Sequence, residues 1–381
     1  MAIADELRPS TFEEAAADLA SASSRGRSVR IRGAGTKLDW GFPGQEVDIE
    51  LRTAALNQVL EHNSGDLTAV LEAGVSLAQA QRTFAEAGQM LALDPPLGHD
   101  AAATIGGVFA TGDCGPLRHR YGAPRDLVVG ITVALSDGTI ARAGGKVIKN
   151  VAGYDLAKLF SGSFGTLGMI LSVSVRLHPI PVATATALGA SRDPDVLAAA
   201  ARSLAAAPFQ LEALDVAWGG GRGGLLARCA GAEAERVGHR AARAMSDAGL
   251  EETDVASDDD SLWERQRAGQ RSRSELIVRV AAPPSALEAV LRAVESAAGA
   301  LVGRVALGTS YVEVAPEARG RLEQALPAGA RSIVLDAPAD LRLELDPWGP
   351  LDAASLALMR RIKARFDPAN ACNPGVFVGG I

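Results

Sequence analysis

The stretch 142–177 constrains the fold of this chain most, because a glycine-rich loop there separates a short helix from a long strand. The apolar spacing that ends at Phe160 predicts an amphipathic helix, and the β-branched residues of 169–177 predict a strand. Between them, 161–168 has glycine at every third position. Small residues let backbone N–H groups approach a flat or anionic ligand where a Cβ would block it. We therefore expect a ligand-binding loop, with an ordinary helix-to-strand connection as the alternative.

This loop does not have the dinucleotide-binding pattern G-x-G-x-x-G, which lies between a strand and the helix that follows it. Here the helix comes first and the strand second. The loop is therefore not a fingerprint of the Rossmann type.

Composition limits the class of protein further. A length of 381 residues exceeds one typical domain and suits two. Hydrophobic residues make up 48% of the chain but aromatic residues only 4%, so alanine, valine and leucine must build the core. The net charge of −7, without a dense Lys/Arg run, argues against nucleic acid as a partner.

Targeting segments and metal motifs are not apparent in the sequence. The charged N-terminal stretch does not predict a signal peptide, and no run of about 18 uncharged apolar residues predicts a membrane span. Cys114, Cys229 and Cys372 are far apart and form no C-x-x-C pair, so we expect neither a zinc site nor an iron–sulfur cluster. A protein of the reducing cytoplasm is the simple inference.

Two further glycine-containing segments could hold an anion. A strand expected over 28–32 ends in the small loop 33–37, whose N–H groups could face a pyrophosphate, although a plain turn is an equal alternative. The segment 94–121 is dense in Gly, Pro, Ala and Thr, and loops of this length are usually functional or disordered. Within it, 104–109 predicts a buried helix start whose N–H groups could bind the same phosphate.

After about residue 182 the glycine loops give way to ordinary strand and helix patterns. The mixture predicts an antiparallel α+β layer with helices on one face. The expected strands are 212–218, 225–230, 275–280, 305–307, 311–314, 332–335 and 341–345, and the expected helices are 232–248, 285–298 and 316–326. A basic amphipathic helix is expected over 353–366, and the apolar end of the chain is expected to dock back onto the first domain. The predicted domains are therefore 1–181 and 182–350, with a returning segment 351–381.

Five separated motifs give this chain a family resemblance. "RGAGTK", "AATIGG", "RYGAPRDLVVGITVALSDG", "KNVAGYDLAKLFSGSFGTLGMI" and "FDPANACNPG" occur in the order seen in flavoproteins of the vanillyl-alcohol oxidase type, which have the PCMH-type FAD-binding fold. Within that family the chain most resembles the FAD-binding E subunit of bacterial glycolate oxidase. The resemblance covers about 25–181 and 355–381, more than half of the chain.

The resemblance implies an α+β fold: a two-lobed PCMH-type FAD-binding domain with a smaller α+β cap domain. The first loop and the Thr-Ile-Gly-Gly loop would hold the pyrophosphate, the Gly-Thr-Leu-Gly loop would lie along the dinucleotide, Ile170 would meet the adenine, and Asn373 would approach the flavin ring. The implied cofactor-binding residues are Arg32, Gly33, Ala34, Gly35, Thr36, Lys37, Leu38, Pro96, Thr104, Ile105, Gly106, Gly107, Gly112, Gly165, Thr166, Gly168, Ile170 and Asn373.

The resemblance also implies that FAD is bound without a covalent link. Relatives that attach flavin covalently place His in the first loop and Cys just before the Thr-Ile-Gly-Gly loop. This chain has Thr36 and Ala102 at those positions.

Catalytic residues are not clearly marked in the sequence. Related 2-hydroxyacid dehydrogenases have a late His-rich metal-binding pattern, which this chain lacks, so no metal is expected. His99, beside the phosphate-type loop, and Lys149 are weak candidates, with a polar loop residue and a surface lysine as the respective alternatives. The remaining polar candidates are Asn150, Tyr154, Arg265 and Arg267. The two arginines could bind a carboxylate or contact a partner subunit, with a run of solvated charge as the alternative. His119 is expected in a solvated basic turn.

The leading functional hypothesis is an FAD-binding subunit of a glycolate (2-hydroxyacid) oxidase complex. Its partners would be a second flavin-binding subunit and an iron–sulfur subunit, which could place it at the inner face of the membrane. An autonomous flavoenzyme acting on a small hydroxyl substrate, and a scaffold subunit whose flavin does no chemistry, are the two alternatives.

Overall fold

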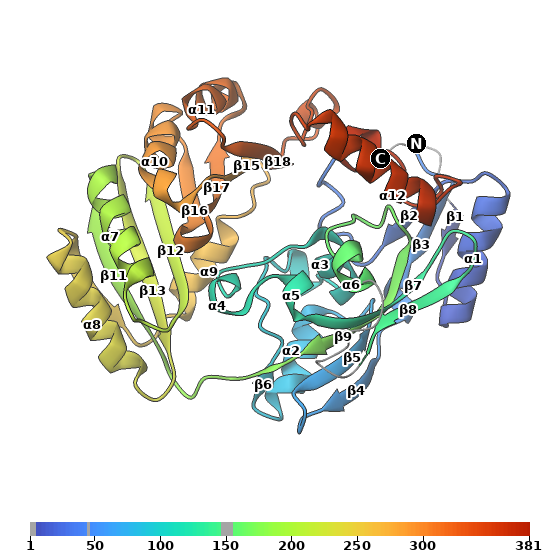
Figure 1. Cartoon of the computed structure of the whole chain (residues 1–381), viewed down its shortest axis with the longest axis horizontal. Helices are drawn as coiled ribbons and strands as arrows, with labels where there is room; N and C mark the ends of the chain where they lie inside the picture. The colour runs from blue at the N-terminus through green and yellow to red at the C-terminus, as the bar shows by residue number, and fades with distance from the viewer. Residues whose placement is uncertain (1–4, 44–45, 146–154) are drawn as a thin grey trace. The chain divides into compact units, whose positions relative to one another are not determined.

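The computed structural model describes residues 5–43, 46–145 and 155–381, which form two compact units (Figure 1). The first unit comprises residues up to 114, 122–180 and 350–381. The second comprises 115–121 and 181–349. The first unit therefore contains both the N-terminal part of the chain and its last thirty residues or so, which are far apart in sequence.

The larger sheet of the first unit has five antiparallel strands in the order β4-β5-β9-β7-β8. Their bounds are β4 Val59–Asn63, β5 Thr68–Glu72, β7 Val128–Ala134, β8 Ile140–Gly144 and β9 Met169–Arg176. Six of the eight residues of the central strand β9 are buried in nearly unbroken order, because both faces of the strand are covered. The strand predicted after the glycine loop is confirmed, one residue shorter than expected.

The smaller sheet of the first unit is parallel, in the order β1-β3-β2. Its strands are β1 Asp5–Leu7, β2 Val29–Arg32 and β3 Ile49–Arg52, and helix α1, Phe12–Ser24, packs against them. Leu19 of α1, Leu51 of β3 and Leu171 of β9 belong to one core cluster, which also includes Cys372 near the chain end. A single core therefore joins both sheets and the C-terminal segment.

The remaining elements of the first unit are short helices, strands and turns, apart from the 14-residue helix α12. They are α2 Leu77–Ala85, α3 Ile105–Thr111, α5 Pro124–Leu127, α6 Leu156–Phe160, α12 Ala353–Phe366, the strand pair β6 Gln89–Met90 and β10 His178–Pro179, and the 3₁₀ turns η1 Thr53–Ala55, η2 His99–Ala101 and η7 Val378–Gly380. The hydroxyls of Thr11, Ser76 and Thr104 accept N–H groups at the starts of α1, α2 and α3, which is why the chain becomes helical there.

The second unit is built on an eight-stranded antiparallel sheet in the order β14-β11-β13-β12-β16-β17-β15-β18. The strands are β11 Thr184–Ser191, β12 Leu211–Gly219, β13 Arg222–Ala230, β14 Glu251–Ala256, β15 Leu276–Ala281, β16 Ala300–Arg304, β17 Thr309–Val314 and β18 Arg331–Asp336. The helices are α4 Arg118–Tyr121, α7 Pro194–Ala206, α8 Ala234–Asp247, α9 Asp260–Ala268, α10 Leu287–Ser296 and α11 Arg319–Ala325, with 3₁₀ turns η3 Pro284–Ala286, η4 Val305–Leu307, η5 Pro316–Ala318 and η6 Leu341–Leu343.

Three predictions for this unit are wrong. The segments 305–307 and 341–345, predicted as strands, contain the turns η4 and η6, because the first is the reversal between β16 and β17 and the second turns back on Pro338. Helices α7, α8, α10 and α11 pack on one face as expected, but α9 packs on the other, with the indole of Trp263 against Ala213 and Leu226. The charged residues of α9 concealed this inward-facing side of the helix.

The α9 face of the sheet is held by a polar network. Arg228 bonds to Asp259 at 3.1 and 3.2 Å and lies 3.6 Å from Glu212. The Trp263 indole donates to the hydroxyl of Thr186 at 2.8 Å, and this hydroxyl donates to Asp259 at 2.7 Å. Because buried charges are stable only when they are paired and hydrogen-bonded, this network fixes the register of α9 on the sheet.

Segment 115–121 joins the same network, although its neighbours in sequence belong to the first unit. The Tyr121 hydroxyl donates to Glu212 at 3.0 Å, and burial beside that carboxylate raises the pKa of Tyr121 to about 12. His119 is half-buried and burial lowers its pKa, so the expectation of a solvated turn is wrong for this residue. Packing against β12 is the reason.

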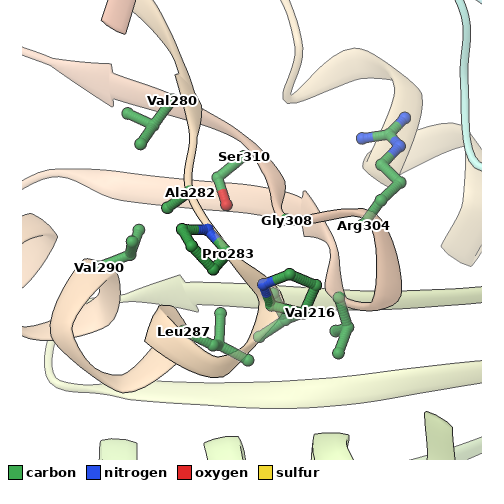
Figure 2. Close-up of a pocket in the computed structure, with 11 residues that line it drawn as sticks. Val216, Val280, Ala282, Pro283, Leu287, Val290, Arg304, Gly308 and Ser310 are labelled. Carbon is green, nitrogen blue, oxygen red and sulfur yellow. The ribbon is translucent and has the colours of Figure 1, made fainter. Parts of the chain in front are cut away.

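Asp215 is the most deeply buried acid on the α9 face. Its side chain is 0% exposed, its oxygens lie no nearer than 3.9 Å to the Arg304 guanidinium, and burial raises its pKa to about 6. Figure 2 shows Arg304 extending away from Val216 and Leu287, which line a cavity of about 10 Å³ on the apolar face. Neighbouring side chains of β12 therefore lie on faces of opposite character: Asp215 on the polar α9 face and Val216 on the apolar face.

Asp215 makes stability depend on pH. Its folded pKa of about 6 lies above the ordinary 3.8. The folded chain therefore keeps a proton that the unfolded chain releases in this window, and stability falls as pH rises from about 4 to 6. We expect Asp215→Asn to remove a decline on the order of 3 kcal/mol, measured by chemical denaturation at several pH values. The surface change Asp247→Asn is the control, and equal pH slopes for wild type and Asp215→Asn would contradict this account.

Candidate functional site

The loop after β2 lies directly against the segment that precedes α3. A Cβ added at Gly33 would be 2.2 Å from the hydroxyl oxygen of Thr104, and one at Gly98 would be 2.6 Å from the methyl of Thr36. Heavy atoms do not approach this closely, so both positions require glycine. The structure therefore brings together the first two segments that the sequence assigned to the site.

Lys37 joins this loop to two other segments. Its ammonium lies 3.2 Å from Asp113 and donates to the carbonyl of Pro96 at 3.4 Å. The side chains of Lys37 and Asp113 are only 5% and 2% exposed. A buried pair of this kind destabilises the protein strongly when one partner is removed, so Lys37 fixes the shape of the loop. Leu38, next in the chain, is 38% exposed.

The start of α3 differs from the expectation of free N–H groups. Ile105 and Gly106 donate to the carbonyls of Val75 and Ala73, both at 2.8 Å, and the N–H of the next residue bonds to the Thr104 hydroxyl. A Cβ at Gly106 would be 2.8 Å from that of Ala73. Gly106 is thus required for close packing of α3, and these amides are already bonded within the protein.

The glycine loop 161–168 lies against the other end of α3. Gly162 donates to Phe109 at 3.0 Å and Phe164 donates to Ala110 at 2.8 Å. Gly112 ends α3 with a φ of 64°, and a Cβ added there would be 3.6 Å from the Cα of Gly162. Gly168 has a φ of 146°, and a Cβ there would be 2.6 Å from the carbonyl of Ala134. Both ends of the loop are therefore fixed by backbone contacts.

Asn373 connects the chain end to this loop and to β2. Its N–H donates to Val29 at 2.8 Å, and its side-chain oxygen accepts the N–H of Ile31 at 2.7 Å. Its side-chain NH₂ donates to the carbonyl of Phe164 at 2.6 Å. A Cβ at Gly165 would lie 2.7 Å from this amide nitrogen. One side chain thus links β2, the strand that leads into the first loop, to the glycine loop.

Backbone strain gathers around these segments. Asp100, Ala101, Phe164 and Asn373 have φ values of 53°, 51°, 56° and 40°, in the left-handed region that non-glycine residues rarely adopt. Each such residue costs roughly 1–3 kcal/mol and persists only where its surroundings impose it. Four further non-glycine residues with positive φ, Leu67, Glu252, Ala298 and Asn370, lie outside these segments, so the φ values show that the loops are tightly held and do not alone identify a site.

Several predicted residues lie apart from this cluster. The side chain of His99 is 77% exposed and bonds to neighbouring Asp100 at 2.7 Å. Ile170 is buried within β9. Arg32, by contrast, lies under the first loop: its guanidinium pairs with Glu50 at 2.9 Å, and a Cβ at Gly35 would be 2.8 Å from its Nε. Lys149, Asn150 and Tyr154 lie outside the described residues, and Arg265 and Arg267 lie on α9 of the second unit.

Sequence reasoning missed Lys363 and Asp367. The Lys363 ammonium donates to the carbonyl of Thr166 at 2.7 Å, to Asp367 at 2.7 Å and to the carbonyl of Cys372 at 2.9 Å. The available signal was a lysine four residues before the aspartate of "FDPANACNPG", on the helix that precedes this motif. Burial raises the pKa of the Cys372 thiol above its usual range.

Across 5–43, 46–145 and 155–381, side chains of His, Cys, Asp and Glu form no group of three that could bind a metal ion. Of the helices that the structure describes, none has both the length and the apolar character that a membrane crossing needs.

Comparison with known families identifies the cofactor. Residues 6–144 match the family described as FAD binding domain, and residues 350–377 match the family of FAD linked oxidases, C-terminal domain. Residues 6–144 are an FAD-binding domain. FAD is therefore the cofactor of this chain, and the fold is the predicted PCMH-type α+β fold.

Individual relatives agree with this assignment. The chain is 35% identical over 212 residues to glycolate oxidase subunit GlcD of Bacillus subtilis and 36% identical over 156 residues to subunit GlcE of Escherichia coli, covering 55% and 40% of this chain. It spans 45% and 43% of those proteins, less than half of each. An uncharacterized FAD-linked oxidoreductase of Mycobacterium tuberculosis is 28% identical over 98% of this chain and 90% of its own length.

Among solved structures, alkyldihydroxyacetonephosphate synthase matches with a TM-score of 0.70 at 14% identity, over 97% of this chain and 75% of that one. At this identity the match shows the fold alone.

The residues of the cluster fit FAD. The hydroxyls of Ser161 and Ser163 are buried and, among the described residues, lack a hydrogen-bond partner, as does the Nε of Arg32 under the first loop. Buried polar groups are normally satisfied, so such groups point to a ligand. Among the glycines of the glycine loop, Gly162 has no atom within 4 Å of its Cβ position, which leaves room for a ligand there.

The contact between Gly33 and Thr104 can be tested directly. In Gly33→Ala the added methyl would overlap the hydroxyl of Thr104. The first loop and the segment before α3 must then move apart, at a cost of roughly 1–3 kcal/mol of folding free energy. We expect FAD to bind about tenfold more weakly or worse, measured by titrating apoprotein with FAD.

Gly320→Ala, at an open position of α11 in the second unit, is the matched control and should bind FAD normally. A folded Gly33→Ala protein with unchanged FAD affinity would show that these loops do not form the site.

Proposed function

We propose that this chain is an FAD-binding subunit of a glycolate (2-hydroxyacid) oxidase complex, in which it takes part in oxidising the CH–OH group of a small 2-hydroxyacid. The observation that supports this most is the convergence of the first loop, the glycine loop and Asn373 through contacts within one unit. Segments more than 300 residues apart in sequence meet there, as an extended dinucleotide requires.

The names of the relatives support the substrate class. Besides the glycolate oxidase subunits, the chain is 37% identical to a D-lactate dehydrogenase of Archaeoglobus fulgidus and to a bovine D-2-hydroxyglutarate dehydrogenase, over 45% and 46% of its length. Glycolate, D-lactate and D-2-hydroxyglutarate all carry a hydroxyl beside a carboxylate. We therefore propose a small 2-hydroxyacid as the substrate.

Bound FAD supplies the hydride-accepting chemistry, so the chain has to bind, orient and shield it. We propose that the first loop and the Thr104 segment line the diphosphate, that Gly165, Thr166 and Gly168 lie along the dinucleotide, and that Asn373 lies at the flavin ring. Thr36 and Ala102 offer no nucleophile of the kind that covalent attachment uses, so FAD is held non-covalently.

A base must accept the hydroxyl proton of the substrate. His99 and Lys149 remain the candidates. The exposure of His99 and its bond to Asp100 favour a role at the solvent edge of the site over that of a buried base.

The proposed partners are a second flavin-binding subunit and an iron–sulfur subunit, in the cytoplasm or at the inner face of the membrane. The support is that the chain resembles both the GlcD and the GlcE subunits named above. The match to an FAD-linked oxidoreductase over 98% of this chain favours a second candidate, an autonomous flavoenzyme.

Spectra of the purified chain separate these functions. We expect a yellow protein that releases free FAD on acid precipitation, because nothing binds the flavin covalently. Anaerobic glycolate or D-lactate should leave its visible flavin band unchanged until the partner subunits are added, and should then bleach it.

Bleaching of the isolated chain would instead establish the autonomous enzyme. A yellow protein that is inert even with its partners would establish a scaffold subunit. Failure to bind FAD under any condition would overturn the proposal.

A further inference from the structure

The Lys363 ammonium uses all of its donors inside the protein. It donates to the carbonyl of Thr166, to the carbonyl of Cys372 and to the carboxylate of Asp367, at 2.7 to 2.9 Å. An ammonium group has three N–H donors and no acceptor, so none is left for another ligand. Its side chain is 8% exposed and that of Asp367 is 0% exposed. We therefore expect this buried lysine to hold the three groups that it bonds to in a fixed arrangement, and not to bind a ligand itself.

Asp367 holds the other side of this arrangement. Its carboxylate accepts the N–H groups of Ala371 and Cys372 at 3.1 and 2.8 Å, in addition to the Lys363 ammonium. These bonds close the turn after α12 and direct the chain to Asn373. Lys363 and Asn373 are therefore parts of one rigid C-terminal clasp, which we define as residues 363–373.

The clasp binds two alternate carbonyls of the glycine loop. Asn373 donates to Phe164 at 2.6 Å and Lys363 donates to Thr166 at 2.7 Å. The N–H groups of these same two residues bond elsewhere, to Ala110 and Ser163. The peptide groups that start at Phe164 and at Thr166 are thus each fixed through their oxygen atoms.

Fixing these oxygens also fixes the next N–H groups. The peptide bonds that the structure describes are trans, and in a trans peptide the N–H points opposite to the C=O. The N–H groups of Gly165 and Leu167 therefore point away from the clasp. Neither of them donates to another described residue of the chain. These two donors, separated by one residue, lie on the side of the loop away from the clasp, in residues that are themselves buried.

We propose that Lys363 is a positioning residue for FAD, which acts through the carbonyl of Thr166 to hold the Leu167 N–H toward the cofactor, with Asn373 acting in the same way on Gly165. The inference rests on the proposed cofactor contacts of the glycine loop. It explains why a lysine is buried where a methionine would fill the same space: only a cation with several donors can hold Thr166, Cys372 and Asp367 together.

Lys363→Met tests this proposal in the full chain. Thr166 loses its donor, the Leu167 N–H is no longer held, and FAD should bind about ten- to a hundredfold more weakly. The readouts are the FAD dissociation constant of the apoprotein, the fine structure of the bound flavin spectrum and the melting temperature of the apoprotein. Lys158→Met, on α6 just before the loop and 48% exposed at its side chain, is the matched control and should match wild type.

Lys363→Met leaves Asp367 as a buried charge without its cation, so the double variant Lys363→Met/Asp367→Asn is measured beside it. Ala371 and Cys372 donate to different oxygens of Asp367, so the asparagine oxygen keeps one of these bonds and the buried charge is removed, while Thr166 still lacks its donor. We expect the double variant to recover part of the melting temperature but not the FAD affinity, and Lys363→Arg to recover part of the affinity.

A folded double variant that binds FAD as tightly as wild type, with the same spectrum, would overturn the positioning role and leave only a structural one. The proposed function would stand in that case, because wild type would still bind FAD. If wild type itself does not bind FAD, the proposed function fails instead.

Discussion

The bonding of backbone groups at the ends of the loops decides how this site is built. Every buried peptide group needs hydrogen-bond partners. Where the protein binds the carbonyl of a trans peptide on one side of a loop, the N–H of the same peptide points to the other side. Asn373 and Lys363 of the C-terminal segment donate to the carbonyls of Phe164 and Thr166 in the glycine loop. We propose that the donors left over face FAD. In that proposal the C-terminal segment takes part in the site through hydrogen bonds and not only through packing.

The second unit uses the two faces of one sheet differently. Odd-numbered positions of β13 such as Leu225 and Ala227 join a continuous apolar core, whereas Arg228 on the other face is paired with acids. Asp215 and Arg304 continue the ionic face on the neighbouring strands β12 and β16. Ionic pairs contribute little net stability, but they specify one arrangement of α9 and of segment 115–121 on the sheet. The unit thus has a uniform core on one side and a specific polar layer on the other.

Sequence patterns predicted the elements that have a strong hydrophobic period or clear capping and turn residues at their ends. Helix 353–366 was predicted to the residue, and strand β9 to within one, because β-branched or amphipathic patterns dominate there. The cofactor followed from five ordered motifs. Helix α7 and strand β16 were not predicted, because runs of alanine and glycine give little hydrophobic contrast. Helix α9 was read as solvated charge, since the inward spacing of Trp263 and Gln266 is short within a polar run.

The finer chemistry of the site could not be predicted, because it depends on contacts between distant segments. The need for glycine at position 33 comes from Thr104, and the need for glycine at position 106 comes from Ala73, neither of which is close in sequence. The free amides expected at the start of α3 are bonded to the chain around Ala73. The spacing of Lys363 to Asp367 indicates a pair within one helix turn, but the sequence does not show that this lysine also bonds to the carbonyl of Thr166, some 200 residues earlier.

Hydrogen–deuterium exchange of the apoprotein and of the FAD-loaded chain tests most directly whether these segments hold one cofactor. The account predicts that FAD slows exchange together in 33–38, 165–168 and 371–373, while the amides of 105–107, already bonded, change little. Slower exchange in only one of the three segments, or mainly in the second unit, would contradict it.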